Sequence, residues 1–312
     1  MRAFVFPGQG AQTLGMGSDL AQAYPAAQAV FDEVDAALGE KLSDIIWGED
    51  LDRLTLTQNA QPALMATSLS VVAALRAEGV EMGAADFVAG HSLGEYSALA
   101  AAGTFSISDT ARLLRKRGEA MQAAVPVGVG AMAAILGLDF DQATQVAAEA
   151  AGTDVCQVAN QNDPSQNVIS GSVTAVERAL DLAKEAGAKR AILLPVSAPF
   201  HCSLMAPAAE VMARALADVD MKAPSAPVVA NVAAEAVSAP DEIRALLVEQ
   251  VTGQVRWMSS VEWMVAQGVT EIWEIGAGKA LSGMIRRIDR SVETRAISSP
   301  DDVVAAAAAL AA

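Results

Sequence analysis

The sequence is poor in cysteine and histidine. Its two cysteines, Cys156 and Cys202, lie far apart and lack the spacing of metal ligands. A disulfide framework and a structural zinc site are therefore not expected, and we predict no metal. The two histidines, His91 and His201, are the only imidazoles available for acid–base chemistry.

Positive charge and long apolar runs are also scarce. The 21 Lys and Arg residues face 37 Asp and Glu, for a net charge of −16, which argues against nucleic acid or an anionic membrane as a partner. The alanine-rich segment from Val303 to Ala312 is about half the length of a membrane span. Residues 1–6 are too short for the apolar part of a signal peptide. We expect a cytoplasmic protein.

What the sequence has in quantity is apolar residues. They make up 53% of 312 residues, against 19% charged residues, so the chain can bury a large core in one or two domains.

The most informative segment is Gly90-His91-Ser92-Leu93-Gly94. An apolar stretch at 86–89 precedes it, and a small-residue helical pattern follows it to Ala102. Strand, Gly-x-Ser-x-Gly and helix in this order are typical of a nucleophile elbow, which presents a serine beside the amide of the next residue and a helix N-terminus. The segment predicts Ser92 as a nucleophile; the alternative is an ordinary glycine-rich turn.

Outside residues 126–198, strand patterns alternate with helical ones. This alternation predicts an α/β fold with a mostly parallel sheet, as in α/β-hydrolases. We expect strands at 2–6, 86–89, 228–231 and 271–275, and helices at 19–38, 61–78, 109–124, 204–217, 241–250, 259–267 and 279–288.

Residues 126–198 have a different pattern, bounded by Pro126 and Pro195. The order is strand, helix, two strands joined by a turn at 161–165, helix and strand, which is the βαββαβ order of a ferredoxin-like domain. We expect these elements at 130–138, 141–151, 155–160, 166–170, 173–186 and 188–194. The sequence thus predicts a small domain, 126–198, inserted into a large catalytic domain made of 1–125 and 199–312.

A serine nucleophile needs a base, and histidine is the usual one. His91 adjoins Ser92, and successive side chains at an elbow point in different directions, so His91 is poorly placed. His201 is the remaining candidate, and its alternative is a structural histidine. Cys202 is a rival nucleophile, but the same adjacency to His201 disfavours it, and a buried packing residue is the simpler interpretation.

Arg117 lies on the apolar face of its predicted helix, with Leu114, Gly118 and Met121. A buried guanidinium needs an anionic partner. That partner is either a carboxylate of the protein, in a buried ion pair, or a carboxylate of the substrate, held by the parallel hydrogen bonds of an Arg fork.

Five motifs now stand in a recognisable order. They are Gly8-Gln9-Gly10-Ala11-Gln12, Gly90-His91-Ser92-Leu93-Gly94-Glu95-Tyr96, Arg117 with Gly118 and Met121, Pro199-Phe200-His201-Cys202, and Glu274-Ile275-Gly276-Ala277-Gly278. In these motifs and over its whole length the chain resembles malonyl-CoA:acyl carrier protein transacylases, the stand-alone enzymes of bacterial type II fatty acid synthesis.

The resemblance implies a role for each matching residue. Ser92 is acylated, and His201 acts as base and then as acid. A backbone carbonyl, here that of Gln250, orients His201, and the backbone amides of Gln9 and Leu93 form the oxyanion hole. Arg117 then binds the free carboxylate of the malonyl group.

The resemblance also implies malonyl-CoA and acyl carrier protein as partners. We expect no cofactor beyond the CoA thioester that serves as substrate, and we expect a monomer, although nothing in the motifs specifies the oligomeric state. Two other functions remain possible: a serine hydrolase or thioesterase of the α/β type, and a carrier-protein-binding homologue without catalysis. Because carrier proteins are themselves acidic, docking needs a local basic patch. The candidates are Lys279, Arg286, Arg287 and Arg290, which we favour, and Lys184, Lys189 and Arg190.

Overall fold

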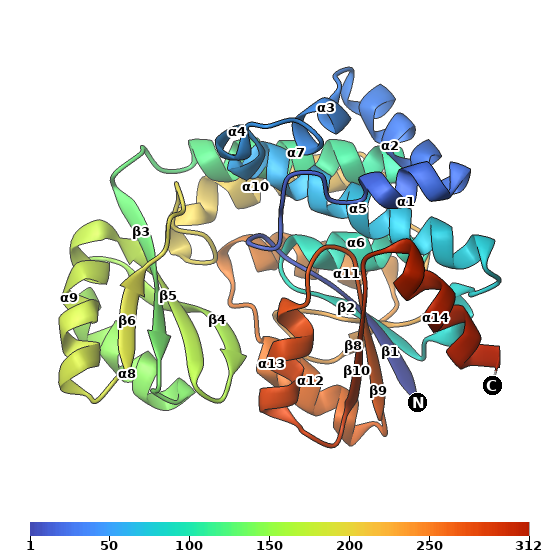
Figure 1. Ribbon diagram of the computed structural model, residues 1–312. Coiled ribbons are helices and arrows are strands. Elements are labelled where there is room, and N and C mark those ends of the chain that lie inside the picture. Colours follow the sequence, from blue (N-terminus) through green and yellow to red (C-terminus); the bar gives the residue numbers. More distant parts are fainter. Residues whose placement is uncertain (312) are drawn as a thin grey trace.

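The computed structural model describes residues 1–311, and its strands form two separate sheets (Figure 1). The larger sheet has the order β10-β9-β1-β2-β7-β8. All its neighbouring strands are parallel except β8, which runs antiparallel to β7. The prediction of an α/β fold with a mostly parallel sheet is confirmed. The strands are β1 (Arg2–Phe6), β2 (Phe87–Gly90), β7 (Val228–Val229), β8 (Ala236–Val237), β9 (Glu271–Ile275) and β10 (Glu293–Ile297).

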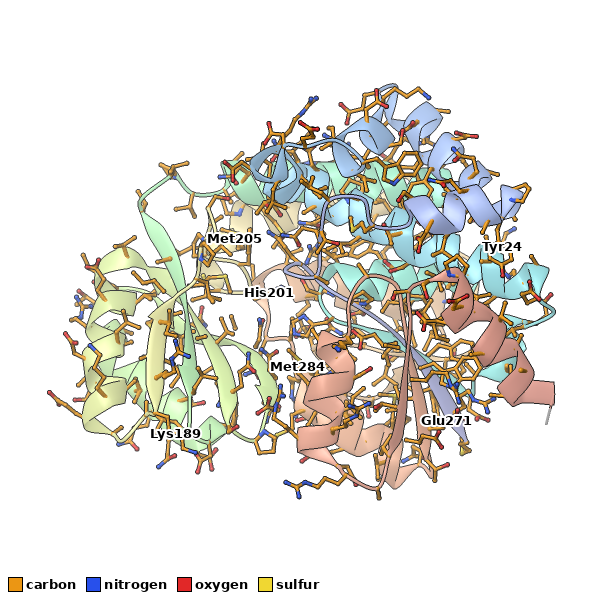
Figure 2. The ribbon with its side chains drawn as sticks, in the orientation of Figure 1. Tyr24, Lys189, His201, Met205, Glu271 and Met284 are labelled. Carbon is orange, nitrogen blue, oxygen red and sulfur yellow. The ribbon has the colours of Figure 1, made fainter. Side chains whose placement is uncertain are left out.

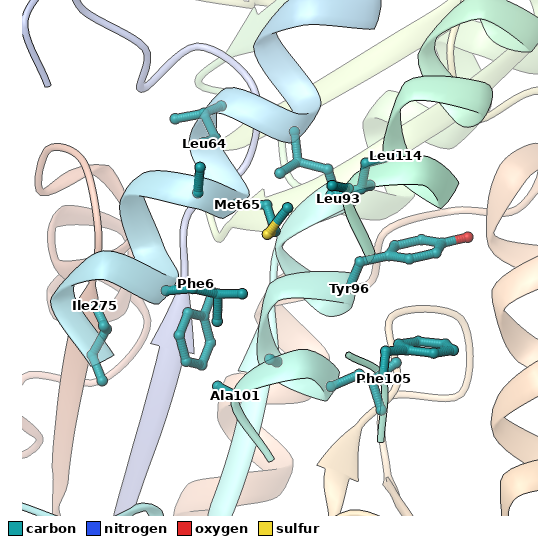
Figure 3. Packing of buried hydrophobic residues seen from close by; sticks show 14 of the residues in the cluster. Phe6, Leu64, Met65, Leu93, Tyr96, Ala101, Phe105, Leu114 and Ile275 are labelled. Carbon is teal, nitrogen blue, oxygen red and sulfur yellow. The ribbon is translucent and has the colours of Figure 1, made fainter. Parts of the chain in front are cut away.

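Helices cover both faces of this sheet because alternate side chains of β1 are buried on opposite sides. Phe4 and Phe6 belong to one core cluster and Ala3 and Val5 to another. Figure 3 shows the first cluster, where Phe6 lies among residues of the helices above it. The helices that contribute buried residues to this cluster are α1 (Ser18–Ala23), α2 (Pro25–Leu38), α3 (Leu42–Ile46), α4 (Leu51–Thr55), α5 (Thr57–Ala77), α6 (Leu93–Ala101), α7 (Ile107–Ala123), α10 (Ala206–Ala217), α11 (Pro240–Thr252) and α14 (Pro300–Ala311). The second cluster is covered by α12 (Trp257–Ala266) and α13 (Ala280–Ile288).

Residues 130–193 form a separate lobe around the second sheet, which is antiparallel and has the order β4-β5-β3-β6. Its elements are β3 (Gly130–Leu136), α8 (Phe140–Ala151), β4 (Cys156–Asp163), β5 (Gln166–Ser172), α9 (Val173–Glu185) and β6 (Arg190–Leu193). Residues such as Ile135, Val146, Ile169 and Val176 give this lobe its own core.

Strand β4 joins the lobe to the larger body. The amide of Gln161 donates to the carbonyl of Val255, and the amide of Val255 donates to the carbonyl of Ala159. The buried carboxylate of Asp163 pairs with Arg287 on α13 at 2.6 Å. Main-chain and side-chain bonds thus fix one edge of the lobe.

Several predicted boundaries are wrong for identifiable reasons. The helix expected at 19–38 is two helices, since Pro25 starts α2 after an extended Tyr24. Helix α5 begins at Thr57 rather than 61, so Pro62 lies inside it. Helix α7 begins at Ile107 rather than 109, because Ser106 caps it with a hydroxyl that accepts from the amide of Asp109.

Three elements near the end of the chain were not predicted. They are the two-residue strand β8, the strand β10 and the helix α14. Within residues 1–311, no helix combines the length and the apolar character that a bilayer crossing requires. Two short 3₁₀ helices, η1 (Met82–Ala84) and η2 (Ser203–Met205), complete the described chain.

Candidate active site

Ser92 lies at a sharp turn between β2 and α6. Its φ of 53° and ψ of −111° are unusual for a residue other than glycine, as expected of a strained elbow. A side chain at Gly94 would place its Cβ 2.2 Å from the carbonyl oxygen of Phe6, so only glycine lets α6 start this close to β1. The serine therefore stands at the carboxyl end of the central strands.

The side chain of Ser92 contacts His201. Its Oγ is 2.7 Å from Nε2 of His201, and Nδ1 of the same ring lies 2.9 Å from the carbonyl oxygen of Gln250. A carbonyl only accepts, so Nδ1 carries the proton and Nε2 is left to accept one from the serine hydroxyl. Figure 2 shows His201 between the smaller lobe and the large body.

His201 is buried, and burial together with the positive charge of Arg117 lowers its pKa from 6.5 to about 3. The ring is therefore neutral at physiological pH, as a general base must be.

Arg117 is brought to the same place by the close packing of α7 on α5. A Cβ at Gly118 would lie 2.5 Å from Cα of Gln58, so glycine at this position allows the two helices to touch. The guanidinium is 1% exposed and donates to Oε1 of Gln61 at 2.7 Å, to Oε1 of Gln250 at 2.8 Å and to Oγ of Ser92 at 3.1 Å.

These partners differ from one of the two sequence expectations. Among residues 1–311, no carboxylate accepts a hydrogen bond from Arg117 or forms an ion pair with it, and its buried Nε has no partner. The guanidinium also lies 5.6 Å from the ring centre of Tyr96. The buried ion pair with a protein carboxylate is thus absent from the described chain, and the cation remains available to an anionic ligand.

A cavity of about 410 Å³ opens beside these groups, within the size range of small-molecule sites. Ser92, His201 and Arg117 line it together with the candidate oxyanion residues Gln9 and Leu93. In the described chain neither the amide of Gln9 nor that of Leu93 donates a hydrogen bond, so both are free to bind an oxyanion. The apolar part of the wall comes from Met121, Met132, Leu194, Pro195, Val196 and Phe200.

Two residues that the sequence disfavoured are occupied elsewhere. Nε2 of His91 is 2.9 Å from Oδ1 of Asn162 on β4, so its ring is bonded to the smaller lobe. Cys202 is fully buried, and its thiol donates to the carbonyl of Pro199. Burial raises the pKa of the Cys202 thiol, which suits a packing residue and not a nucleophile.

Sequence reasoning missed the side chains that hold the elbow in place. Oδ1 of Asn231 accepts from the amide of Ser92 at 2.8 Å, and its Nδ2 donates to the carbonyl of Gly90 at 2.7 Å. The sequence signal was a single amide, Asn231, at the end of the strand predicted at 228–231. The structure places this strand, β7, beside β2. Gln61 was also missed, because it is one of several polar residues near the start of α5, where Gln58 and Asn59 precede it.

Glu95 is the third omission, even though it belongs to the motif that carries the serine. Its Oε2 accepts from Nε2 of Gln250 at 2.8 Å and from the amide of Asn231 at 3.1 Å. Burial raises the pKa of Glu95 to about 7, although these hydrogen bonds and the charge of Arg117 act in the opposite direction. A buried carboxyl with a raised pKa that contacts Gln250, a partner of Arg117, is typical of a functional site.

Comparisons with known proteins all identify acyltransferases as similar to this chain. Residues 3–277 match the family model described as acyl transferase domain. The chain is 48% identical, over 302 residues, to the malonyl CoA-acyl carrier protein transacylase of Bacillus subtilis, covering 96% of this chain and 94% of that relative.

Solved structures give the same picture. The fold is similar to the acyl-carrier-protein-S-malonyltransferase of Bartonella henselae, with a TM-score of 0.98, 52% identity and coverage of 100% of this chain and 99% of the other. It is also similar to a chain of a complex described as a type II PKS acyl-carrier protein with its malonyl-transacylase. There the TM-score is 0.96 at 40% identity, with 99% of both chains covered.

Proposed function

The chain belongs to the family of malonyl CoA-acyl carrier protein transacylases, and from this premise we propose how its residues perform the transfer. It is an [acyl-carrier-protein] S-malonyltransferase that moves the malonyl group of malonyl-CoA to the thiol of acyl carrier protein for fatty acid synthesis.

In the proposed first half-reaction, Ser92 Oγ attacks the thioester carbonyl while its proton passes to Nε2 of His201. The negative charge on the carbonyl oxygen is stabilised by the amides of Gln9 and Leu93. The C–S bond then breaks, and His201 returns the proton to the CoA sulfur. A malonyl-serine ester remains.

In the second half-reaction, the phosphopantetheine thiol of the carrier protein gives its proton to His201 and attacks the ester. The bond between the acyl carbon and Ser92 Oγ breaks, and the serine recovers its proton. This ping-pong sequence uses only groups of one chain and the two thiols. We therefore propose a monomer that needs no metal and no cofactor beyond its thioester substrate.

The observation that carries this proposal is Arg117: a buried guanidinium, bonded to neutral oxygens, beside the hydroxyl of Ser92. A carboxylate at this position would neutralise it and would satisfy its free Nε. A serine hydrolase would offer no reason for such a group, and here a backbone carbonyl holds His201 where hydrolases of the α/β type use Asp or Glu.

The test is intact-mass measurement of the protein after exposure to malonyl-CoA, acetyl-CoA and methylmalonyl-CoA. We expect a malonyl adduct on the native chain and none on Ser92→Ala. With carrier protein added, the adduct should disappear as malonyl carrier protein forms. Release of free malonate instead would support the hydrolase, and the absence of any adduct would support a non-catalytic binding protein.

For the smaller lobe we propose the finer description of an inserted ferredoxin-like domain, 126–198, between the two parts of the catalytic domain, 1–125 and 199–312. The strand order β4-β5-β3-β6, the antiparallel pairing and the separate core support it. We also propose a cytoplasmic location, which fits the two buried, unpaired cysteines.

We propose that the carrier protein docks near α13. Figure 2 shows Lys189 at the far end of the smaller lobe, away from His201, whereas Met284 on α13 lies closer to it. Arg287 is paired with Asp163, and Nε of Arg286 donates to Thr294. Arg286 and Arg290 are exposed and available to an acidic partner.

A further inference from the structure

Three consecutive hydrogen bonds connect the guanidinium of Arg117 to the segment that carries Gln9. Nη1 of Arg117 donates to Oε1 of Gln61 at 2.7 Å. Nε2 of Gln61 donates to Oγ1 of Thr57 at 3.0 Å, and this hydroxyl donates to Oε1 of Gln9 at 3.0 Å. The proposed carboxylate site and the proposed oxyanion hole are therefore joined by side chains from the first two turns of α5.

The direction of this chain is set at one end. A guanidinium has donors only, so the oxygen of the Gln61 amide must face Arg117 and its nitrogen must face away. Thr57 then accepts from that nitrogen, which leaves its own proton for the oxygen of Gln9. No member can turn around without breaking a bond to its neighbour.

Burial makes these bonds costly to lose. Thr57 and Gln61 are each 1% exposed, and a buried polar group that loses its partner is costly. Gln9, in contrast, lies on an irregular segment and is only partly buried. A polar contact from a rigid helix to a loop side chain holds the loop, and here the loop contains a backbone amide that the reaction needs.

We propose that Thr57 is a positioning residue: through Gln9 it holds residues 7–10, called here the oxyanion loop, at a fixed place relative to the Arg117 guanidinium. This inference rests on the proposed function. It explains how the site can match both ends of one acyl group, since the distal carboxylate and the reacting carbonyl bind to groups held by the same chain of bonds.

The variant that tests it is Thr57→Val, which keeps the shape of the side chain and removes the hydroxyl. We expect kcat for malonyl transfer to fall about five- to tenfold, the effect of one lost hydrogen bond. The KM for malonyl-CoA should change less than twofold, because Arg117 still binds the carboxylate. With acetyl-CoA, which lacks that carboxylate, kcat should fall by the same factor.

Two matched variants separate positioning from general damage to the helix. Thr57→Ser retains the hydroxyl and should restore kcat. Thr67→Val changes an equally buried threonine of α5, whose hydroxyl donates to the carbonyl of Ala63 within the helix, and should leave kcat unchanged. Thermal unfolding of all three proteins shows whether each is folded at the assay temperature.

A double-mutant cycle tests whether the hydrogen bonds of Gln61 and Thr57 act together. Since Gln61 and Thr57 act in series, Gln61→Leu and Thr57→Val should be less than additive in their effect on kcat. Additive losses would overturn the proposal. So would a folded Thr57→Val protein with native kcat, or a Thr57→Ser protein as slow as Thr57→Val.

Measuring the native protein in the same assay distinguishes a failure of the Thr57 proposal from a failure of the proposed function. If the native protein forms no malonyl adduct, the proposed function fails. If it transfers malonyl at its usual rate and Thr57→Val does so equally, only the role of Thr57 fails.

Discussion

The guanidinium of Arg117 contacts the hydroxyl of Ser92 directly, with Nη2 donating to Oγ at 3.1 Å. The same cation that is proposed to bind the distal carboxylate thus touches the atom that we propose becomes acylated. Its charge favours the developing negative charge on Oγ before attack. After acylation the free carboxylate of a short dicarboxylic group can fold back onto it.

Replacing Arg117 should change which acyl group is transferred. In Arg117→Ala we expect kcat/KM with malonyl-CoA to fall about 10- to 100-fold, the loss of charge-assisted hydrogen bonds to the carboxylate. Acetyl transfer should fall less or rise. Steady-state transfer with both thioesters measures the ratio of malonyl to acetyl kcat/KM. In Arg117→Lys, which keeps the charge without the fork, this ratio should lie between those of the native protein and Arg117→Ala. Equal losses for both substrates would contradict the assignment.

Glu95 should make the free energy of unfolding depend on pH. The pKa of Glu95 is about 7 in the fold and 4.5 when unperturbed, so the folded chain holds a proton that the unfolded chain releases. The contribution of this proton to the free energy of unfolding is complete below about pH 4.5. It is lost as the pH rises through 7, and the loss is about 3 kcal/mol.

Urea unfolding of the native chain and Glu95→Gln at pH 5, 6, 7 and 8 isolates this effect. The lost contacts to Gln250 and Asn231 add a constant difference, whereas the titration adds a slope. We expect the stability of the variant to improve relative to the native chain as the pH rises. A difference that stays flat over this range would show that Glu95 titrates elsewhere.

His201 should not limit the reaction near pH 6.5. Because its pKa is lowered to about 3, the ring remains neutral and able to accept the serine proton down to mildly acidic pH. Rapid-quench measurement of malonyl-enzyme formation between pH 5 and 8 should show no loss centred at 6.5. The profile is best repeated in Glu95→Gln, so that the titration of Glu95 is not mistaken for that of the imidazole.

The elbow should tolerate no side chain at Gly94. In Gly94→Ala the new Cβ meets the carbonyl oxygen of Phe6, and we expect a loss of about 3 kcal/mol or more in stability, together with loss of acylation. Gly83→Ala is the control, since its Cβ would meet no atom within 4 Å and its backbone is unstrained. Chemical denaturation compares the two variants, and a similar small effect in both would refute the steric argument.

Reversing the charge of basic residues on α13 and just beyond it should weaken the binding of carrier protein and leave the binding of malonyl-CoA unchanged. In Arg286→Glu with Arg290→Glu we expect a higher KM for carrier protein, increasingly so at low salt, and an unchanged rate of acylation by malonyl-CoA. Lys184→Glu with Lys189→Glu, in the other basic cluster, is the matched control. If the KM for carrier protein is unchanged in the Arg286/Arg290 variant, or rises equally in both variants, α13 is not the docking site.

Much of the fold could be predicted because its longer elements have strong local patterns. The strand at 271–275 and the helices around 173–185 and 240–252 appear where apolar periodicity places them. Strand β8 has two residues and β10 is only partly buried, so neither has a pattern that distinguishes it from a loop. Helix α5 starts four residues before its predicted start, and its first turns include Thr57 and Gln61, which bond to Gln9 and Arg117, partners that local sequence does not reveal.

The site divides in the same way. Ser92 could be found from its motif and His201 by elimination, since both depend on residue type and order. The roles of Asn231, Gln61 and the side chain of Gln250 depend on which amide faces which partner across the fold. These contacts join residues 56 to 139 positions apart, so a local sequence pattern does not reveal them.

The position of β1 in the larger sheet has a consequence for biosynthesis. Its two neighbours in the sheet are β2 and β9, and β9 ends only at residue 275. The sheet on both sides of β1, from which the oxyanion loop follows, is therefore complete only once β9 has been synthesised. Until then the apolar side chains of β1 lack one of their neighbouring strands, so pairing between strands far apart in sequence is expected to come late in the folding of this sheet.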